Sequence, residues 1–378
     1  VSYETLTTGT ATAGDDFTAD SGTVTFSAGS KVATVNIAVL GDTTYENSGS
    51  DETVKIKFTG SQLTADVTAT GSITENDTDP ATVAQNLTLT TGADTGSSFE
   101  GRESANDVFD GAVDSSLDTT DSLDGKGGTD TLNATFLSSN SIRPTLANIE
   151  VIQITAGDAH GDAVTIDTRD ISGATTYTSE SSDGELTLNF LSALPTININ
   201  SGTDDTTINF TDAALASSSQ TLTVNLNNYV ASGAAEFLAI TDAGGTTNTL
   251  ETLSLVTSSL ASTIDDLQTT AVGTTTLKIS GDQNLTIDNA LDTEITTVNA
   301  STFTGDLALN AGLGASTGGV TVTTYTGADS VIAGTTGADT ISLGAGNDTY
   351  GVASASLTSD DTVNLGAGTD TLQTTDAL

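Results

Sequence analysis

Apolar and polar residues alternate with a period of two over most of this chain. Within residues 1–79 the alternating segments are GTVTFS (22–27), VATVNIAV (32–39), ETVKIKF (52–58) and VTATGSITE (67–75). Such alternation predicts strands that bury one face, and short strands at this spacing favour a β-sandwich. The segment that follows contains Pro80 and is predicted to be a linker.

The long middle of the chain, from about residue 145 to about 325, repeats short strand-like segments between loops of variable length. These segments are IEVIQIT (149–155), AVTID (163–167), ELTLNF (185–190), TININ (196–200), TTINF (206–210), TLTVNL (221–226), TTLKI (275–279), NLTID (284–288) and DLALN (306–310). Recurrent short strands predict stacked rungs, as in a parallel β-solenoid, or a long meander. Residues 211–220 and 257–271 are candidates for short helices.

The charge balance is strongly acidic, with 50 Asp and Glu against 8 Lys and Arg and a net charge of -42. Because no basic patch is present to neutralise phosphate, nucleic acid is not an expected partner. Many aspartates fall in glycine-rich turns, where calcium loops place them. Acids that serve only solvation, as in salt-adapted proteins, are the alternative. The chain has no Cys for disulfides, and no apolar run approaches the ~18 residues of a membrane helix.

Residues 334–351, GTTGADTIS and LGAGNDTYG, form two nine-residue units with Gly at the fourth place, Asp at the sixth and an apolar residue at the eighth. Similar phrases are LGAGTDTL (365–372) and GKGGTDTL (125–132). Each unit predicts a turn followed by a short strand, and we expect the two consecutive units to stack on one another. Carboxylates ~4 Å apart repel by about 1 kcal/mol in water, and calcium with its six to eight oxygen ligands removes that repulsion. Ordinary Asx turns are the alternative.

These phrases resemble the RTX (repeats-in-toxin) nonapeptide G-G-x-G-x-D-x-U-x, although several units lack the first or second Gly, as at Thr335. The resemblance implies several separate calcium sites, secretion by a type I system and folding triggered by extracellular calcium. The candidate ligands are the phased acids and the turn glycines, whose carbonyls would complete each shell. They are Asp107, Asp121, Gly128, Asp130, Asp329, Gly337, Asp339, Gly344, Gly346, Asp348, Asp361, Gly366, Gly368 and Asp370.

The opening VSYETLTTGTATAGDDFTADSGTVTFSAG, with VNIAVLGDTTYE (35–46) and GSITEND (71–77) after it, resembles a Calx-β domain. The resemblance implies an Ig-like sandwich with calcium at one end, held by the matching acids Asp16, Asp42, Glu46 and Asp77. A Calx-β fold without an occupied site is the alternative. The match begins at the third of seven strands, so we expect the first strands to be missing. An edge beside residues 1–7 or 52–59 should then be open, to be filled by upstream residues or a neighbouring subunit.

The predicted fold is therefore all-β, a partial Calx-β sandwich followed by a β-solenoid or β-roll region with RTX-type calcium-binding turns. The expected segments are the sandwich (1–79), a linker with RTX-like turns (80–135), an irregular solenoid or strand-repeat domain (136–322) and a second RTX-like block (323–378).

The combination of segments resembles type I-secreted bacterial surface-layer proteins and related RTX adhesins. It implies a calcium-dependent extracellular structural protein on the cell surface, which self-assembles with identical subunits into a surface layer or filament. A cell-surface polysaccharide is a candidate partner. The alternative function is that of an adhesin segment that binds a matrix or host ligand.

Catalysis is not expected. His160 is the only histidine and lies in GDAHGDA (157–163), where a solvated turn residue is expected. The acid pairs Asp204/Asp205 and Asp265/Asp266 have the chemistry of glycosidase carboxylates. However, a chain without Trp and with only 6 Tyr lacks the aromatic platforms expected of a carbohydrate-cleaving solenoid.

Overall fold

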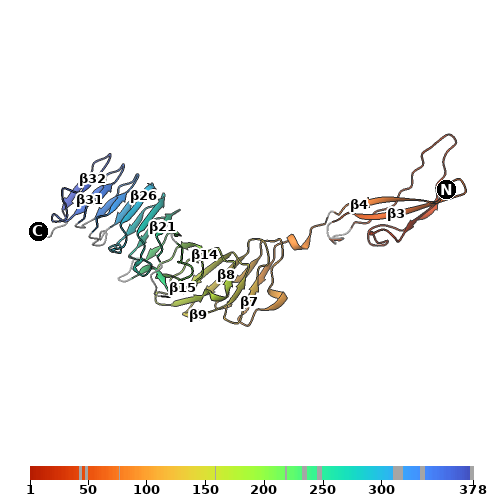
Figure 1. Ribbon diagram of the computed structural model, residues 1–378. Coiled ribbons are helices and arrows are strands. Elements are labelled where there is room, and N and C mark those ends of the chain that lie inside the picture. The colour runs from red at the N-terminus through yellow and green to blue at the C-terminus, as the bar shows by residue number, and fades with distance from the viewer. Residues whose placement is uncertain are drawn as a thin grey trace. The chain divides into compact units, whose positions relative to one another are not determined.

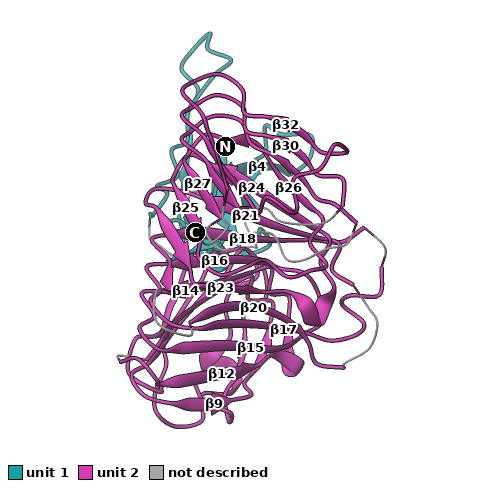
Figure 2. Ribbon diagram, turned by 90° about the vertical axis from the view of Figure 1, so that its left-hand side faces the viewer, with its two compact units in different colours: residues 1–83 teal, residues 84–378 magenta. Residues whose placement is uncertain are grey.

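The structure, a computed structural model, describes residues 1–41, 45–46, 50–75, 77–157, 159–217, 219–231, 236–244, 249–309, 318–332 and 337–374. It contains two compact units, unit 1 (Val1–Val83) and unit 2 (Ala84–Leu378), which Figure 2 colours separately. The described residues form strands and four short 3₁₀ turns, η2 (Pro80–Thr82), η3 (Gly96–Phe99), η4 (Thr168–Asp170) and η5 (Thr270–Val272). None of them forms an α-helix, and none could span a membrane as a helix.

The described residues of unit 1 form one antiparallel sheet of order β2-β1-β3-β4. Its strands are β1 (Ser2–Leu6), β2 (Ser21–Thr23), β3 (Glu52–Thr59) and β4 (Val67–Ile73). The buried core is small, formed by Ala11, Phe17 and Val54. Because so little apolar surface is enclosed here, the sheet contributes only a modest hydrophobic stabilisation.

The predicted strand at 32–39 is not formed, and that prediction is wrong. The segment runs beside the sheet with one bridge, from Phe17 to Val39, because no strand among the described residues of unit 1 completes its hydrogen-bond ladder. An open apolar hollow of about 500 Å³ is left, lined by residues such as Phe26, Val32 and Phe58. The sandwich is therefore incomplete. The predicted position of the open edge is also wrong, because β1 and β3 are paired on both sides and the sheet ends at β2 and β4.

Unit 2 is a parallel β-solenoid of about 12 turns, whose rungs follow one another in Figure 1 from β7 and β8 to β31 and β32. Its main sheet has thirteen strands: β5 (Asn86–Thr88), β6 (Val108–Gly111), β8 (Thr131–Phe136), β11 (Val151–Ala156), β14 (Thr176–Glu180), β16 (Thr196–Asn200), β18 (Thr221–Asn227), β21 (Thr252–Thr257), β24 (Thr276–Gly281), β26 (Thr297–Phe303), β28 (Thr321–Thr323), β30 (Thr340–Ser342) and β32 (Thr362–Asn364).

Three smaller parallel sheets complete the rungs. The first has six strands: β9 (Asn140–Ile142), β12 (Ala163–Asp167), β15 (Glu185–Leu191), β17 (Thr206–Phe210), β20 (Phe237–Asp242) and β23 (Asp266–Gln268). The second has seven: β19 (Val230–Ala231), β22 (Ser262–Ile264), β25 (Leu285–Ile287), β27 (Leu307–Leu309), β29 (Ser330–Ile332), β31 (Thr349–Val352) and β33 (Thr371–Thr374). The third has three: β7 (Ser122–Asp124), β10 (Thr145–Ala147) and β13 (Ile171–Ser172).

The alternating pattern explains how the solenoid closes around a core. In β11, Ile152 and Ile154 point inward and are buried, while Gln153 between them is partly exposed. Parallel pairing without slippage places Ile152 beside Leu132 and Tyr177 of the adjacent rungs, so inward side chains form columns along the axis. Each fully buried aliphatic side chain contributes about 1.5–3 kcal/mol.

The all-β fold, with its partial sandwich and its solenoid, is confirmed. Two predicted segment boundaries fall inside strands, however. Position 135/136 lies within β8 and position 322/323 lies within β28, because one continuous sheet joins all the rungs of unit 2. The helices predicted at 211–220 and 257–271 are wrong for the described residues, and the second stretch contains β22, β23 and the start of η5.

Candidate calcium sites

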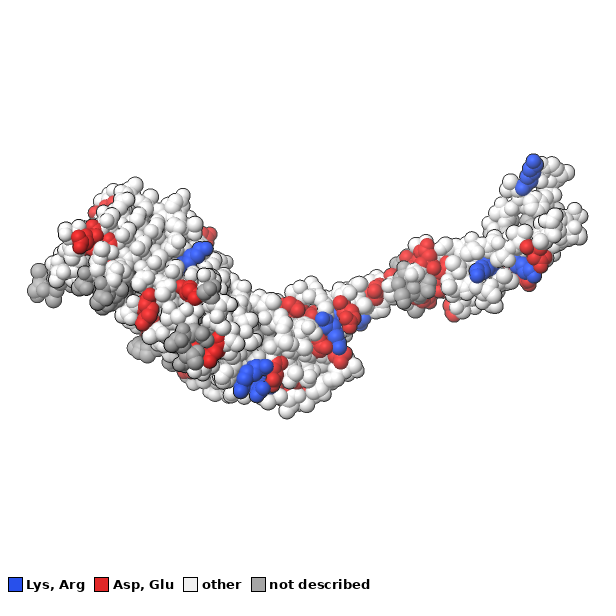
Figure 3. All heavy atoms as spheres, in the orientation of Figure 1, with Lys and Arg blue, Asp and Glu red and all other residues white. Residues whose placement is uncertain are grey.

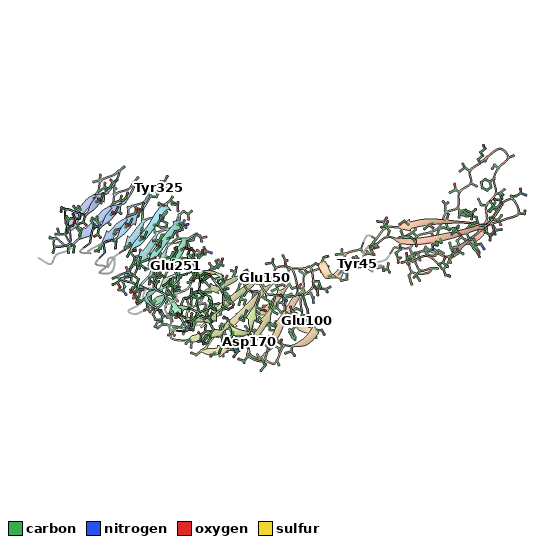
Figure 4. The ribbon with its side chains drawn as sticks, viewed as in Figure 1. Tyr45, Glu100, Glu150, Asp170, Glu251 and Tyr325 are labelled. Atoms are coloured by element: carbon green, nitrogen blue, oxygen red, sulfur yellow. The ribbon has the colours of Figure 1, made fainter. Side chains whose placement is uncertain are left out.

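Acidic residues stand directly before the strands of many rungs and stack along the corners of the solenoid. In the main sheet the acids in this position are Asp107, Asp130, Glu150, Glu251, Asp339 and Asp361, and Figure 4 labels Glu150 and Glu251. In the seven-stranded sheet they are Asp306, Asp329, Asp348 and Asp370. Since parallel strands pair in register, each of these acids lies next to the corresponding residue of the adjacent rungs.

In the seven-stranded sheet the last three of these aspartates each accept a backbone hydrogen bond from the preceding rung. The amide of Asp329 donates to Oδ1 of Asp348 at 2.9 Å, and the amide of Asp348 donates to Oδ1 of Asp370 at 3.1 Å. The amide of Leu307 donates to Oδ1 of Asp329 at 2.9 Å. We call Asp329, Asp348 and Asp370 the C-terminal aspartate column.

The same arrangement occurs in the main sheet. Near the C-terminus the amide of Asp339 donates to Oδ1 of Asp361 at 2.8 Å. At the other end the amide of Asp107 donates to Oδ1 of Asp130 at 2.7 Å, and the amide of Asp130 donates to Oε2 of Glu150 at 2.8 Å. In a parallel column beside it, the amide of Asp94 donates to Oδ1 of Asp121 at 2.8 Å.

Consecutive nine-residue units do not stack on one another, and that prediction is wrong. Asp339 precedes β30 in the main sheet, whereas Asp348 precedes β31 in the seven-stranded sheet. Asp121 and Asp130 are likewise divided between two sheets. The reason is geometric: a turn and one short strand cover only half a coil, so stacking partners come from the next coil.

Burial of these acids argues against the solvation alternative. Nine aspartates of the described chain are buried: Asp16, Asp94, Asp107, Asp121, Asp130, Asp204, Asp329, Asp339 and Asp348. On the face shown in Figure 3, acidic side chains form separate clusters on a mostly uncharged surface. Acids that act only through hydration would stand in water, so the buried ones need another explanation.

The buried carboxylates fit a cation. Desolvation raises the pKa of Asp130 and of Asp329 to about 6, and raises that of Asp348. The Oδ2 atoms of Asp130 and Asp348 are buried and accept no hydrogen bond, while their Oδ1 atoms are used by the column. A buried carboxylate oxygen without a partner is costly. A bound cation would supply that partner, and carboxylate and carbonyl oxygens are the ligands calcium prefers.

The turn glycines allow adjacent coils to pack closely. Gly344 has a φ of +82°, and a Cβ there would lie 2.2 Å from the carbonyl oxygen of Tyr325 in the preceding coil. Gly346, Gly366 and Gly368 sit against backbone carbonyls in the same manner, as does Gly128 near the other end, while Gly337 packs against a backbone nitrogen. The carbonyl of Gly344 accepts the amide of Ala367 at 2.9 Å. The predicted glycines therefore lie in the stacked turns.

Unit 1 carries a separate acidic cluster. One carboxylate oxygen each from Asp16, Glu46 and Glu52 lies within 4.8 Å of the others. Glu75 and Asp77 line the same small hollow of about 40 Å³. Burial is the main cause that raises the pKa of Glu52 to about 7, and the hydrogen bond to Asp16 and the charges of Asp16, Glu46 and Glu75 raise it further.

Backbone hydrogen bonds fix this cluster. Glu75 accepts the amide of Glu46 through Oε2 and the amide of Asp77 through Oε1, both at 2.8 Å. Of the predicted acids, Asp16, Glu46 and Asp77 thus meet in one place, and Asp42 lies outside the described residues. Glu52 and Glu75 were not predicted. The available signal was their position at the ends of β3 and β4, at the pole where Asp16 lies.

Residues 1–79 match the family model of the Calx-beta domain. The chain begins with a Calx-beta domain, and a parallel β-solenoid follows it. Neither the curated proteins nor the solved structures gave a match. Calx-beta domains bind calcium, and unit 1 carries a cluster of carboxylate oxygens from Asp16, Glu46 and Glu52. A Calx-beta domain joined to a β-solenoid suggests a calcium-binding extracellular protein.

Proposed function

We propose that this protein is a calcium-dependent extracellular structural protein that self-assembles into a surface layer or filament on a bacterial cell. The observation that carries the proposal is the stacking of buried carboxylates along the solenoid, with Oδ2 of Asp130 and of Asp348 lacking a hydrogen-bond partner. In this proposal the acids hold calcium between adjacent coils, in the manner of RTX repeats. The proposed role is structural and not catalytic, because these acids lie at the starts of strands, where a bound ion would stabilise the rungs.

The open apolar hollow of unit 1 supports self-assembly. Val32 is 77% exposed and Phe26 is 46% exposed, and both line the hollow, where the segment 32–39 has one bridge, from Phe17 to Val39, and no strand ladder among the described residues. Exposed apolar surface together with unpaired backbone favours pairing with another chain. The proposed partners are identical subunits and, as the anchor, a cell-surface polysaccharide. Export by a type I system is also part of the proposal.

The adhesin alternative is favoured by a different observation. A hollow of about 340 Å³ opens on unit 2 between β13 and β15, lined by residues such as Ile171, Ser172, Leu191 and Pro195. A matrix or host ligand bound there would make the chain a binding segment of a larger adhesin.

Light scattering on the full chain distinguishes these functions. In calcium we expect a particle mass several times the 37.8 kDa of one chain. The particles should dissociate when calcium is removed by a chelator, and magnesium is the control cation. Circular dichroism in chelator should show loss of β-signal, since metal binding and folding are coupled in such sites. A mass of one chain in both conditions would contradict assembly. An unchanged spectrum would contradict calcium-dependent folding.

A further inference from the structure

A second cluster of residues that could ligate a metal lies in the six-stranded sheet, away from the nonapeptide turns. Four consecutive rungs contribute to it at one corner. His160 lies in the turn before β12, Glu185 begins β15, Asp204 and Asp205 directly precede β17, and Glu236 directly precedes β20. The chain has one histidine, and the fold places it on this cluster.

The ligand atoms are close enough to share one ion. Nδ1 of His160 lies 2.8 Å from Oδ2 of Asp204 and 3.7 Å from Oε1 of Glu236, and all three atoms lie within 4.8 Å of one another. Tetrahedral ligands at about 2.1 Å from zinc are separated by about 3.4 Å. The two observed distances bracket that value, so small side-chain rotations would suffice.

The position of the central carboxylate is fixed by its surroundings. The side chain of Asp204 is 1% exposed, its Oδ1 accepts the amide of Asp205 at 2.7 Å, and its Oδ2 accepts the amide of Gly161 at 3.2 Å. The buried hydroxyl of Tyr229 lies 3.2 Å from the carbonyl oxygen of Asp204. A preformed, buried ligand lowers the conformational cost of binding.

Charge gives the cluster a reason to bind a cation. Oxygens of Glu185, Asp204 and Asp205 form a second group within 4.8 Å of one another, so four carboxylates belong to two groups that share Asp204, and only one of these groups contains the imidazole. One protonated imidazole would neutralise only one of them. A divalent cation would neutralise more, and in a partly buried position the repulsion it removes is larger than in water.

We propose that His160, Asp204 and Glu236 form a binding site for a divalent cation of the Zn²⁺ class. Imidazole nitrogen is a ligand for zinc and similar transition metals, whereas calcium selects oxygen. The site is therefore chemically distinct from the acid-only clusters. Glu185 and Asp205 stand next to it and supply further negative charge.

The lone histidine makes a direct test possible. Zinc ions are titrated into the full chain in excess calcium, while the imidazole signals of His160 are followed by NMR and the affinity by calorimetry. We expect these signals to shift until one equivalent has bound. His160→Ala and Glu236→Gln should each lower the affinity at least about tenfold, since even the loss of an indirect partner of a metal ligand costs 10–100-fold.

The control variant is Asp183→Asn, which removes an exposed acid from the loop before β15 and should leave zinc affinity unchanged. Imidazole signals that do not respond to one equivalent of zinc would overturn the proposal and leave a simple histidine–aspartate ion pair. Unchanged affinity in His160→Ala would also overturn it, because zinc would then bind other acids. If calcium displaced zinc from the site as readily as zinc displaces calcium, the proposed preference for zinc would be contradicted.

Discussion

Replacing Asp348 by Asn or Ala separates two roles of the C-terminal aspartate column. The Asp348 side chain is buried, its Oδ1 accepts the amide of Asp329 at 2.9 Å, and its Oδ2 accepts no hydrogen bond. Asn keeps an acceptor oxygen for the amide of Asp329 but removes the charge. Ala removes both, so the two variants distinguish the hydrogen bond from the proposed ion.

The expected magnitudes depend on calcium. Asp348→Ala leaves the buried amide of Asp329 unsatisfied, which costs about 1–3 kcal/mol with or without the ion. Asp348→Asn should be neutral or slightly stabilising in chelator, because burial raises the pKa of the Asp348 carboxyl and Asn avoids the charge. In calcium at about 100 times its Kd, bound ion adds about 2.7 kcal/mol to the wild type. Either variant that empties the site loses that amount.

Urea unfolding followed by circular dichroism, in chelator and in excess calcium, measures these free energies. Asp282→Asn is the matched control, since Asp282 is exposed and its Oδ1 accepts only from the side chain of Gln283 at 3.2 Å. Solenoids can unfold in more than one step, so the comparison uses the transition that the variants shift.

The result that would refute the calcium interpretation is an effect of Asp348→Asn that is the same in chelator and in calcium. The column would then serve only as a hydrogen-bond ladder. If Asp348→Ala also behaved like the Asp282 control in chelator, the ladder itself would have no energetic importance.

Three further predictions concern pH, packing and unit 1. In chelator, stability should fall as pH rises from about 4 to about 7. Burial raises the pKa of Asp130 and of Asp329 to about 6 and that of Glu52 to about 7, so the folded chain binds more protons than the unfolded chain in this range. Urea midpoints measured against pH test this, and a midpoint that rises with pH would contradict it. Gly344→Ala should lower the free energy of unfolding by roughly 2–5 kcal/mol, since it adds a clash with the Tyr325 carbonyl to the strain of a left-handed backbone. Gly96→Ala is the control: Gly96 has a φ of +75° and open space around it, so the loss should be only about 1–2 kcal/mol. Equal losses would show that the coils are not tightly packed at Gly344. Glu52→Gln should weaken calcium binding in calorimetry and abolish a carboxyl titration near pH 7 in NMR, whereas an unchanged affinity would remove Glu52 from the proposed ligand set.

The solenoid was predictable from local pattern, but its coil geometry was not. Alternation in segments such as 196–200 and 206–210 predicts strands, and both are strands in the structure. The number of strands in each coil depends on loop lengths and on pairing between distant residues. A period of nine is therefore compatible with units that stack directly and with units that alternate between two sheets, and the structure has the second arrangement.

The candidate sites were predictable where the acids belong to a repeated sequence motif. Asp348 and Asp370 share one, LGAGNDTY and LGAGTDTL, and the structure stacks them. The cluster around His160 has no sequence motif, because its members come from four rungs with loops of unequal length. Only the register of the parallel sheet brings such residues together, and register is a property of the whole fold.

Strand length gives a reason why the C-terminal coils would depend on calcium more than the middle ones. The strands from β28 to β33 have only three or four residues, and β28, β29 and β30 each bury one apolar side chain. By contrast, β18 has seven residues and buries Leu222, Val224 and Leu226. At about 1.5–3 kcal/mol for each buried aliphatic side chain, a short rung loses several kcal/mol of stabilisation relative to a long one.

Hydrogen exchange of the backbone amides tests whether cations compensate for this loss. In chelator the amides of β28 to β33 should exchange much faster than in calcium, because local opening is easiest where few apolar contacts form. The amides of β14, β16 and β18 should stay protected, since long strands and the buried core hold those rungs together. Uniform loss of protection along unit 2 would mean that the coils open as one cooperative unit. Unchanged protection in the C-terminal rungs would mean that their short strands are stable without an ion.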